Sequence, residues 1–207
     1  MHITHFIPVY SPAWQYGGPV LSVSRLCEAL VRRGVAVRVI TTNAGLPDWP
    51  GDQLGKTVHE RGVEVVRYPV DRQGGIIRST ALEKEISDML DGTDLLHISA
   101  VWQPLGQAVQ KAAIRKNIPI LHSLRGGLGP YSMRQKWWKK IPYFILREKT
   151  LLQQAAALHV TSEQEEREIN WLRLKAPCKM LPNPVDLTAL DINKDARSEW
   201  RKKLEIE

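Results

Sequence analysis

The fold is decided by residues 2–42, "HITHFIPVYSPAWQYGGPVLSVSRLCEALVRRGVAVRVITT". Residues 2–7 form a short apolar run typical of a buried strand, and residues 35–42 form a second run rich in β-branched side chains. Between them, residues 18–34 carry apolar side chains at helical spacing and end on a glycine, where a helix C-cap is expected. A strand, a helix and a second strand in this order predict a β-α-β unit with parallel strands.

The same alternation continues along the rest of the chain. We expect further strands at 63–70, 94–100, 118–124, 156–162 and 178–186. We expect helices at 79–92, 104–117 and 133–154, another after the capping-box pair Ser162 and Glu165, and a short charged one in the tail. Pro142 must kink or divide the long helix. The pattern predicts an α/β, Rossmann-like, three-layer α/β/α sandwich with a mostly parallel sheet of about seven strands.

Composition narrows the class of protein. The 207 residues include 29 Lys and Arg against 22 Asp and Glu, which favours anionic partners such as phosphates, acidic lipids or nucleic acid. The cysteines, Cys27 and Cys178, are too few for a disulfide framework and are expected as buried thiols in a reducing compartment. No signal-peptide pattern starts the sequence, and no stretch approaches the roughly 20 apolar residues of a membrane span. We therefore expect a cytoplasmic protein that is at most peripheral to a membrane.

The first strand–helix connection contains Gly17 and Gly18. Glycines let backbone N–H groups approach an anion at a helix N-terminus, so this loop is a candidate phosphate site. The pattern is neither G-x-G-x-x-G nor a P-loop, which disfavours nicotinamide, flavin and ATP. A tight turn that needs a positive φ is the alternative.

A second candidate lies at the end of the expected strand 118–124, in "LHSLRGGLGP". Side chains alternate along a strand, so Ser123 and Arg125 share one face while His122 points to the other. Arg125 precedes a pair of glycines and can hold a phosphate or carboxylate in a fork. We interpret His122, like His97 in the preceding strand, as a packed histidine. Metal ligation has no support, since no His-x-x-x-His, Cys-x-x-Cys or acidic cluster stands at ligand spacing.

A third candidate is the basic, aromatic segment "MRQKWWKKIPYFILREK", residues 133–149. The side chains that define it are Arg134, Lys136, Trp137, Trp138, Lys139 and Lys140. Such a mixture suits an anionic membrane surface, with rings at headgroup level and cations on phosphates. Its charge would also suit nucleic acid, and an ordinary helix with solvated cations is the third interpretation.

Three segments, in this order, resemble the N-terminal half of the GT-B glycosyltransferases of family 4, which are retaining enzymes that use nucleotide sugars. Residues 16–42 resemble that family's first loop, helix and second strand. Residues 118–169 are similar to its "P-x-G-x-L-x-P-W … K … A-x-x-x-H-x-T-S-x-x-E" stretch, and "LPNPVDL" to its "I-P-N-G-V-D" loop before the second domain. Each motif is weak alone, but their shared order makes the resemblance specific. It covers about residues 1–190.

The resemblance implies a site in the cleft between two domains. It makes Arg125 the candidate catalytic residue, in a place where many members carry a histidine, so no role that depends on that histidine carries over. The candidates for binding substrate or donor phosphate are Gly17, Gly18, Gly126, Gly127 and Asn183. An Asx-turn is the alternative for Asn183. The basic, aromatic segment would face the membrane or the acceptor.

The resemblance also implies a domain plan and a function. Residues 1–186 would form the acceptor-binding domain, and residues 187–207 a linker or the start of a donor-binding domain with an E-x7-E motif. We expect the full hexosyltransferase-type enzyme to transfer a sugar from a nucleotide sugar to a saccharide or lipid-linked glycan in polysaccharide biosynthesis. We expect neither a metal cofactor nor a nucleic-acid partner. We expect this chain alone to be inactive. The alternative is a non-catalytic domain that binds a glycan, an anionic lipid or a partner chain.

Overall fold

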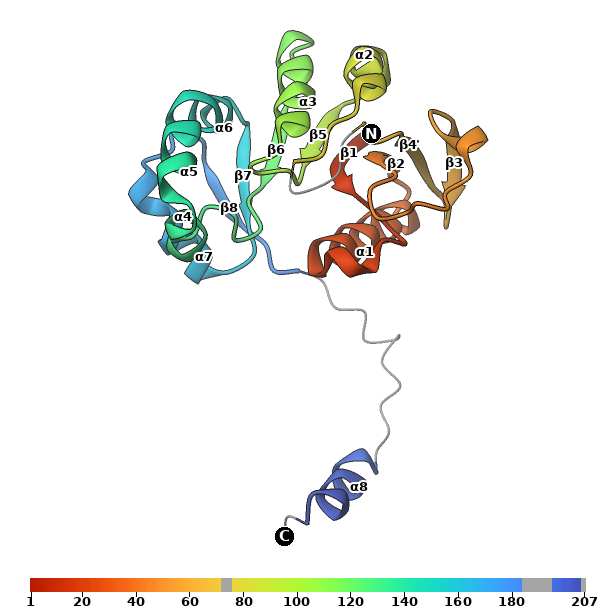
Figure 1. Cartoon of the computed structure of the whole chain (residues 1–207), viewed down its shortest axis with the longest axis vertical. Coiled ribbons are helices and arrows are strands. Elements are labelled where there is room, and N and C mark those ends of the chain that lie inside the picture. Colours follow the sequence, from red (N-terminus) through yellow and green to blue (C-terminus); the bar gives the residue numbers. More distant parts are fainter. Residues whose placement is uncertain (72–75, 184–194, 206–207) are drawn as a thin grey trace.

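A single twisted sheet organises the protein (Figure 1). The computed structural model describes residues 1–71, 76–183 and 195–205, and within them eight strands lie in the order β3-β4-β2-β1-β5-β6-β7-β8. The strands are β1 His2–Val9, β2 Ala36–Thr42, β3 Thr57–Glu60, β4 Val63–Tyr68, β5 Leu95–Ile98, β6 Ile120–Ser123, β7 Ala157–Val160 and β8 Cys178–Met180. Every neighbouring pair is parallel except β3 and β4. The predicted α/β, Rossmann-like fold is therefore confirmed.

Helices cover both faces of the sheet, α1 on one side and α2 and α3 on the other (Figure 1). The α-helices are α1 Gly18–Arg32, α2 Thr80–Met89, α3 Pro104–Arg115, α4 Pro130–Arg134, α5 Trp137–Tyr143, α6 Lys149–Gln153, α7 Glu163–Ile169 and α8 Ala196–Lys203. Short turns are the 3-10 segments η1 Trp14–Tyr16, η2 Gly51–Gln53 and η4 Asn170–Leu172, and the π-helical η3 Phe144–Glu148. Residues 184–194, which hold part of the expected linker, lie outside the described residues.

Two apolar cores follow from the alternation of side chains along the strands. Phe6 lies in register with Ile40, which pairs with Val66, and all three belong to the core on the side of α2 and α3. The next residue of the first strand, Ile7, belongs to the other core, where it joins Cys27 of α1. Strands buried on both faces explain why the sequence shows apolar runs instead of polar alternation.

The eighth strand, β3, is one more than the sequence pattern predicts. It pairs antiparallel with β4 at the edge of the sheet, and its side chains are half-buried or exposed. The connecting residues Arg61 and Gly62 both have positive φ, at 49° and 83°. A four-residue edge strand with little apolar content and no Asn-Gly or Asp-Gly turn gives a weak sequence signal.

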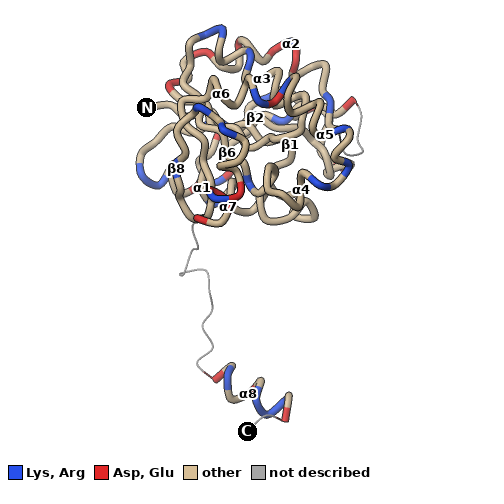
Figure 2. Tube along the Cα trace, turned by 90° about the vertical axis from the view of Figure 1, so that its left-hand side faces the viewer, with Lys and Arg blue, Asp and Glu red and all other residues tan. Residues whose placement is uncertain are grey.

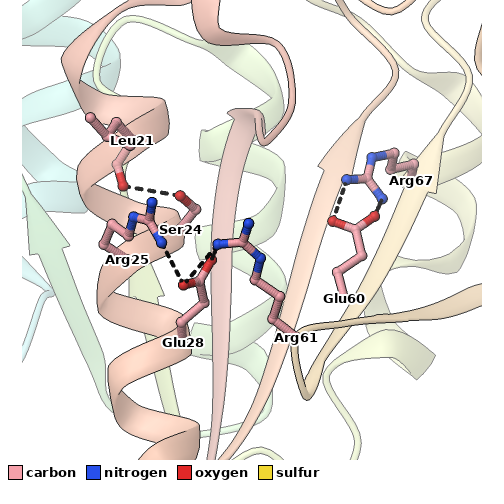
Figure 3. A network of polar contacts seen from close by, with 7 residues as sticks. All are labelled: Leu21, Ser24, Arg25, Glu28, Glu60, Arg61 and Arg67. Atoms are coloured by element: carbon pink, nitrogen blue, oxygen red, sulfur yellow. Dashed lines mark hydrogen bonds and ion pairs between the residues drawn. The ribbon is translucent and has the colours of Figure 1, made fainter. Parts of the chain in front are cut away.

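Ion pairs tie this edge to the body of the fold (Figure 3). Glu28 of α1 accepts from Arg25 at 3.1 Å and from Arg61 of the β3–β4 turn at 3.3 Å. Arg67 of β4 is almost fully buried and donates to both carboxylate oxygens of Glu60, with the Nη2–Oε2 bond at 2.9 Å. A buried bidentate pair of this kind holds β3 in register with β4.

The expected long helix 133–154 is the main correction to the predicted elements. The chain breaks at Gln135 and Lys136, and Lys136 adopts the left-handed conformation with φ 53° before α5 begins. Pro142 lies inside α5 instead of ending it, and the backbone widens into the π-helical η3 two residues later. The sequence shows no glycine or proline at 135–136, so nothing local signals this break.

Candidate active-site cleft

A cavity of about 380 Å³ opens at the carboxyl end of the sheet. Its walls come from the segments that follow β1, β5 and β6, among them Tyr16, Pro19, Val101 and Arg125. In a parallel sheet the carboxyl ends of the strands and the loops after them form the usual ligand site. The cavity therefore brings together the Gly17–Gly18 loop and the loop after β6, which the sequence offered as separate candidates.

The Gly17–Gly18 loop presents the start of α1 to this cleft. Gly17 has φ 88° and ψ −160°, a conformation suited to glycine, and it is the N-cap of α1 without a side-chain cap in the described part of the chain. No atom lies within 4 Å of a Cβ added at Gly17 or Gly18. Open space and an uncapped helix start are what an anion needs to reach the backbone N–H groups.

Arg125 forms the opposite wall and crosses between two elements. Its Nη1 donates to Ser22 Oγ of α1 at 2.9 Å and to Asn183 Oδ1 at 2.6 Å. Its Nε is buried without a hydrogen-bond partner among the described residues. Burial lowers the pKa of the Arg125 guanidinium, and the carboxylate of Glu165 opposes that shift. The structure thus joins Arg125 and Asn183, two of the predicted site residues, in one contact.

The backbone N–H groups of the two glycines that follow Arg125 already form hydrogen bonds within the protein. The N–H of Gly126 donates to Glu165 Oε1 at 2.6 Å, and the N–H of Gly127 donates to the carbonyl of Leu124 at 2.9 Å. Neither N–H can bind a phosphate without giving up that bond. The N–H of Gly17 is held in the same way, because it donates to the carbonyl of Trp14 at 3.0 Å. The predicted phosphate role therefore rests on Gly18 and the start of α1, and it stays a prediction.

Glu165 holds the loop that carries Arg125, a role the sequence pattern did not indicate. Ser162 caps α7 as predicted, since its Oγ accepts from Glu165 N at 3.1 Å. The Glu165 side chain bonds Gly126 as well as Thr161, whose N lies 2.7 Å and Oγ1 2.9 Å from Oε2. The capping-box spacing located this glutamate, and only the fold shows that it reaches across to the next strand-end loop.

Trp102 supports the same loop from the other side. It adopts φ 68°, and its Nε1 donates to the carbonyl of Gly127 at 2.7 Å. Its backbone N donates to the buried carboxylate of Glu148 at 3.1 Å, which also accepts from Gln107 at 3.0 Å. Burial raises the pKa of Glu148. A non-glycine residue in this conformation next to a ligand cleft is a local strain that the surrounding bonds hold in place.

His97 and His122 are buried within the sheet, consistent with their interpretation as packed residues. His122 is buried, neither ring nitrogen has a partner among the described residues, and burial lowers its pKa to about 4. On the other face, Ser123 Oγ lies 2.7 Å from His97 Nε2 and 2.6 Å from His159 Nδ1. In the part of the chain that the structure describes, no group of His, Cys, Asp or Glu is arranged to hold a metal ion.

The basic, aromatic segment forms a surface on α4 and α5, whose basic positions Figure 2 marks in blue. Trp137 and Trp138 are each 59% exposed, and Arg134, Lys136 and Lys139 are exposed beside them. Lys140 differs from the prediction, because it is half-buried and its Nζ bonds the carbonyl of Ser132 at 2.6 Å. Among the described residues, no helix is both long and apolar enough to cross a membrane.

These features define a Rossmann-like domain with a ligand cleft at the carboxyl edge of its sheet. The family model for the glycosyl transferase 4-like domain matches residues 17–184, and the chain belongs to this family. Comparison with curated proteins found no match.

Solved structures share the fold at low sequence identity. Anabaena HepE in complex with UDP-glucose aligns with a TM-score of 0.60 and 15% identity over 99% of this chain and 50% of its own. Sucrose-phosphate synthase from Thermosynechococcus elongatus aligns with a TM-score of 0.58 and 17% identity, over 100% of this chain and 53% of the synthase. UDP-GlcNAc 2-epimerase from Neisseria meningitidis aligns with a TM-score of 0.56 and 14% identity, over 100% of this chain and 54% of the epimerase. The chain thus spans about half the length of these proteins.

Proposed function

We propose that this chain is the acceptor-side half of a retaining, hexosyltransferase-type glycosyltransferase that uses a nucleotide sugar. The observation that carries the proposal is the cleft itself, which is lined both by Arg125 and by Pro19 in the uncapped first turn of α1. Both groups favour negative charge, and a nucleotide-sugar diphosphate is such a ligand. The family of the chain and the UDP-glucose bound to the similar HepE structure support this choice of co-substrate.

The reaction assigns a role to each wall of the cleft. The bond between the anomeric carbon and the diphosphate breaks, and the electron pair leaves with the diphosphate oxygen. The acceptor hydroxyl oxygen bonds to the same carbon from the face that the diphosphate leaves, which retains the configuration, and its proton passes to the departing diphosphate oxygen. Arg125 would stabilise the charge that develops on the leaving group, and the N–H of Gly18 at the start of α1 would add to that stabilisation. Asn183 and Ser22 hold the guanidinium in place. No metal is part of this proposal.

The donor would be held mainly by a second domain, a proposal supported by the coverage, since the chain spans about half the length of the similar structures. The acceptor would be a saccharide or a lipid-linked glycan in polysaccharide biosynthesis. To test this, the complete polypeptide is incubated with labelled nucleotide sugars and a membrane extract of its own cells. Transfer of label to a glycan supports the proposal, and failure of every nucleotide sugar to label any acceptor contradicts it.

We further propose that the α4–α5 surface rests on the cytoplasmic face of an anionic membrane. Exposed tryptophans beside lysines and arginines suit the headgroup region. Replacing Trp137 and Trp138 with alanine should release the protein from phosphatidylglycerol vesicles, whereas replacing Trp171 of η4, which is 54% exposed, should not. If both variants sediment with vesicles like the parent, the surface has no membrane role.

A non-catalytic domain that binds a glycan, an anionic lipid or a partner chain is the second candidate, favoured by the same exposed surface. It predicts binding without any transfer. The labelling experiment separates the two, because a binding domain leaves the nucleotide sugar intact in the presence of every acceptor.

A further inference from the structure

A basic groove runs along α3 on the face of the sheet away from α1. Two adjoining cavities, of about 420 Å³ and 370 Å³, form it between α2 on one side and η3 and α6 on the other. Lys111 and Arg115 of α3 and Arg147 of η3 line both cavities, and Arg78 lines the first. We name this feature the α3 groove.

The cations of the α3 groove are not neutralised by the protein. Within the described residues, none of the four has an acidic side chain at ion-pair distance, although Glu83 lines the first cavity. Lys111 and Arg115 lie four residues apart on one helix, a spacing at which like charges repel. Arg115, in the last turn of α3, gains from the helix dipole, and Lys111 does not. The arrangement therefore favours a bound anion.

The groove changes character along its length. At one end it adjoins the active-site cleft, because Ile77 and Gln103 line the cleft while their chain neighbours Arg78 and Pro104 line the groove. At the other end, apolar side chains join the cations. Those that line the second cavity are Ile114, Leu146 and Leu151.

The cleft adjoins the cations, and apolar side chains lie beside the same cations at the far end of the groove. A sugar, a phosphate and a lipid chain would occupy these parts in that order. An inorganic anion alone would make no use of Leu146, which is 74% exposed. An amphiphile with a phosphate between a sugar and a hydrocarbon chain matches all three parts.

We propose that the acceptor is a lipid-phosphate-linked saccharide whose phosphate binds in the α3 groove. Arg147 and Lys111 hold the phosphate, the hydrocarbon chain leaves along Leu146 toward the membrane, and the sugar extends into the cleft. This inference rests on the proposed glycosyl transfer and names the class of its acceptor. The segment η3, which lines the groove, directly follows α5, the helix that carries Trp137 and Trp138.

The test compares binding to phosphatidylcholine vesicles that contain either polyprenyl phosphate or, at the same mole fraction, phosphatidylglycerol. The complete polypeptide is used with Lys111→Gln and Arg147→Gln together, and with Arg32→Gln and Arg33→Gln as a control. The control pair is exposed at the end of α1 and removes the same charge on the other side of the sheet. Circular dichroism confirms that both double variants are folded.

We expect the groove variant to bind polyprenyl phosphate vesicles about tenfold or more weakly, with a smaller loss for phosphatidylglycerol and little loss in the control. An equal loss for both lipids would overturn the acceptor assignment and make the groove a general headgroup site. Unchanged binding of the groove variant would overturn the site itself. Both results are independent of sugar transfer, so the complete polypeptide could still pass the labelling experiment while this inference fails.

Discussion

Nη1 of Arg125 lies 2.6 Å from Oδ1 of Asn183, although the two residues are 58 positions apart. The contact joins the loop after β6 to the segment after β8, where the family resemblance places the hinge to a second domain. Because the same nitrogen also donates to Ser22 of α1, Arg125 is held at the meeting point of three segments. An arginine held in this way is pre-organised for an anionic ligand.

Replacing Arg125 with alanine should lower turnover of the complete polypeptide by about tenfold or more, because a group that stabilises leaving-group charge is lost. The rate of transfer at saturating nucleotide sugar measures it. Arg167→Ala is the control, since its pair with Glu163 is fully on the surface and both side chains are more than 70% exposed. Turnover close to that of the parent would remove Arg125 from the mechanism.

The two glycines of the first loop should respond differently to alanine. Gly17→Ala should lower the free energy of unfolding by about 1–3 kcal/mol, because φ 88° is a strained conformation for alanine. Gly18→Ala meets open space at an ordinary φ, so it should leave urea unfolding nearly unchanged while lowering kcat/KM through a blocked approach of the ligand. If Gly18→Ala kept full kcat/KM, the loop would be a turn and not an anion site.

Glu165→Gln should loosen the Arg125 loop. The carboxylate accepts from Gly126 N and from two groups of Thr161, whereas the amide nitrogen of glutamine cannot accept. We expect a loss of about 1–3 kcal/mol in unfolding free energy and faster hydrogen exchange at the Gly126 amide. Glu163→Gln, an exposed change on the same helix, should cost within about 0.5 kcal/mol. An unchanged exchange rate at Gly126 would contradict the positioning role.

Stability should fall in acid, in part because of His122. Burial lowers the pKa of folded His122 from 6.5 to about 4, so between these values the unfolded chain binds a proton that the folded chain does not. The contribution of neutral His122 to the free energy of unfolding is therefore fully present above pH 6.5 and is lost as pH falls toward 4. His122→Leu should reduce the slope of unfolding free energy by up to about 1.4 kcal/mol per pH unit and retain stability at neutral pH. Urea titrations across this range measure the slope, and an unaltered slope in the variant would contradict the assignment.

The sequence predicted the elements that depend on apolar patterning and on helix caps. It did not predict features that depend on contacts between side chains and other segments of the chain. The parallel strands and the caps at Ser79 and Ser162 followed from local rules, and the structure shows both caps, Ser79 accepting from Leu82 N at 3.2 Å. The break at Lys136 had no local signal, and the chain there turns α5 back so that Lys140 bonds Ser132. That contact withdraws Lys140 from the surface it was expected to share.

The candidate site shows the same division. Gly17, Gly18 and Arg125 could be found from glycines and a cation at strand ends, because those positions follow from the topology. The contacts of Glu165, Ser22 and Trp102 with this site could not be found, since no local pattern shows which side chains of α1 and of the neighbouring strand-end segments reach the loop after β6. The bond from Gly126 to Glu165 was hidden for the same reason, whereas the bond from Gly127 to Leu124 closes a local turn.

The central claim is that this cleft belongs to an enzyme that transfers a sugar with retention. The most direct measurement is proton NMR of the complete polypeptide incubated with nucleotide sugars, including UDP-GlcNAc, with and without a lipid-linked glycan extract. We predict that nucleotide is released only with the extract and that the new glycosidic bond has the anomeric configuration of the donor. Conversion of UDP-GlcNAc to its 2-epimer without any acceptor, the reaction named for the similar Neisseria structure, would contradict the account.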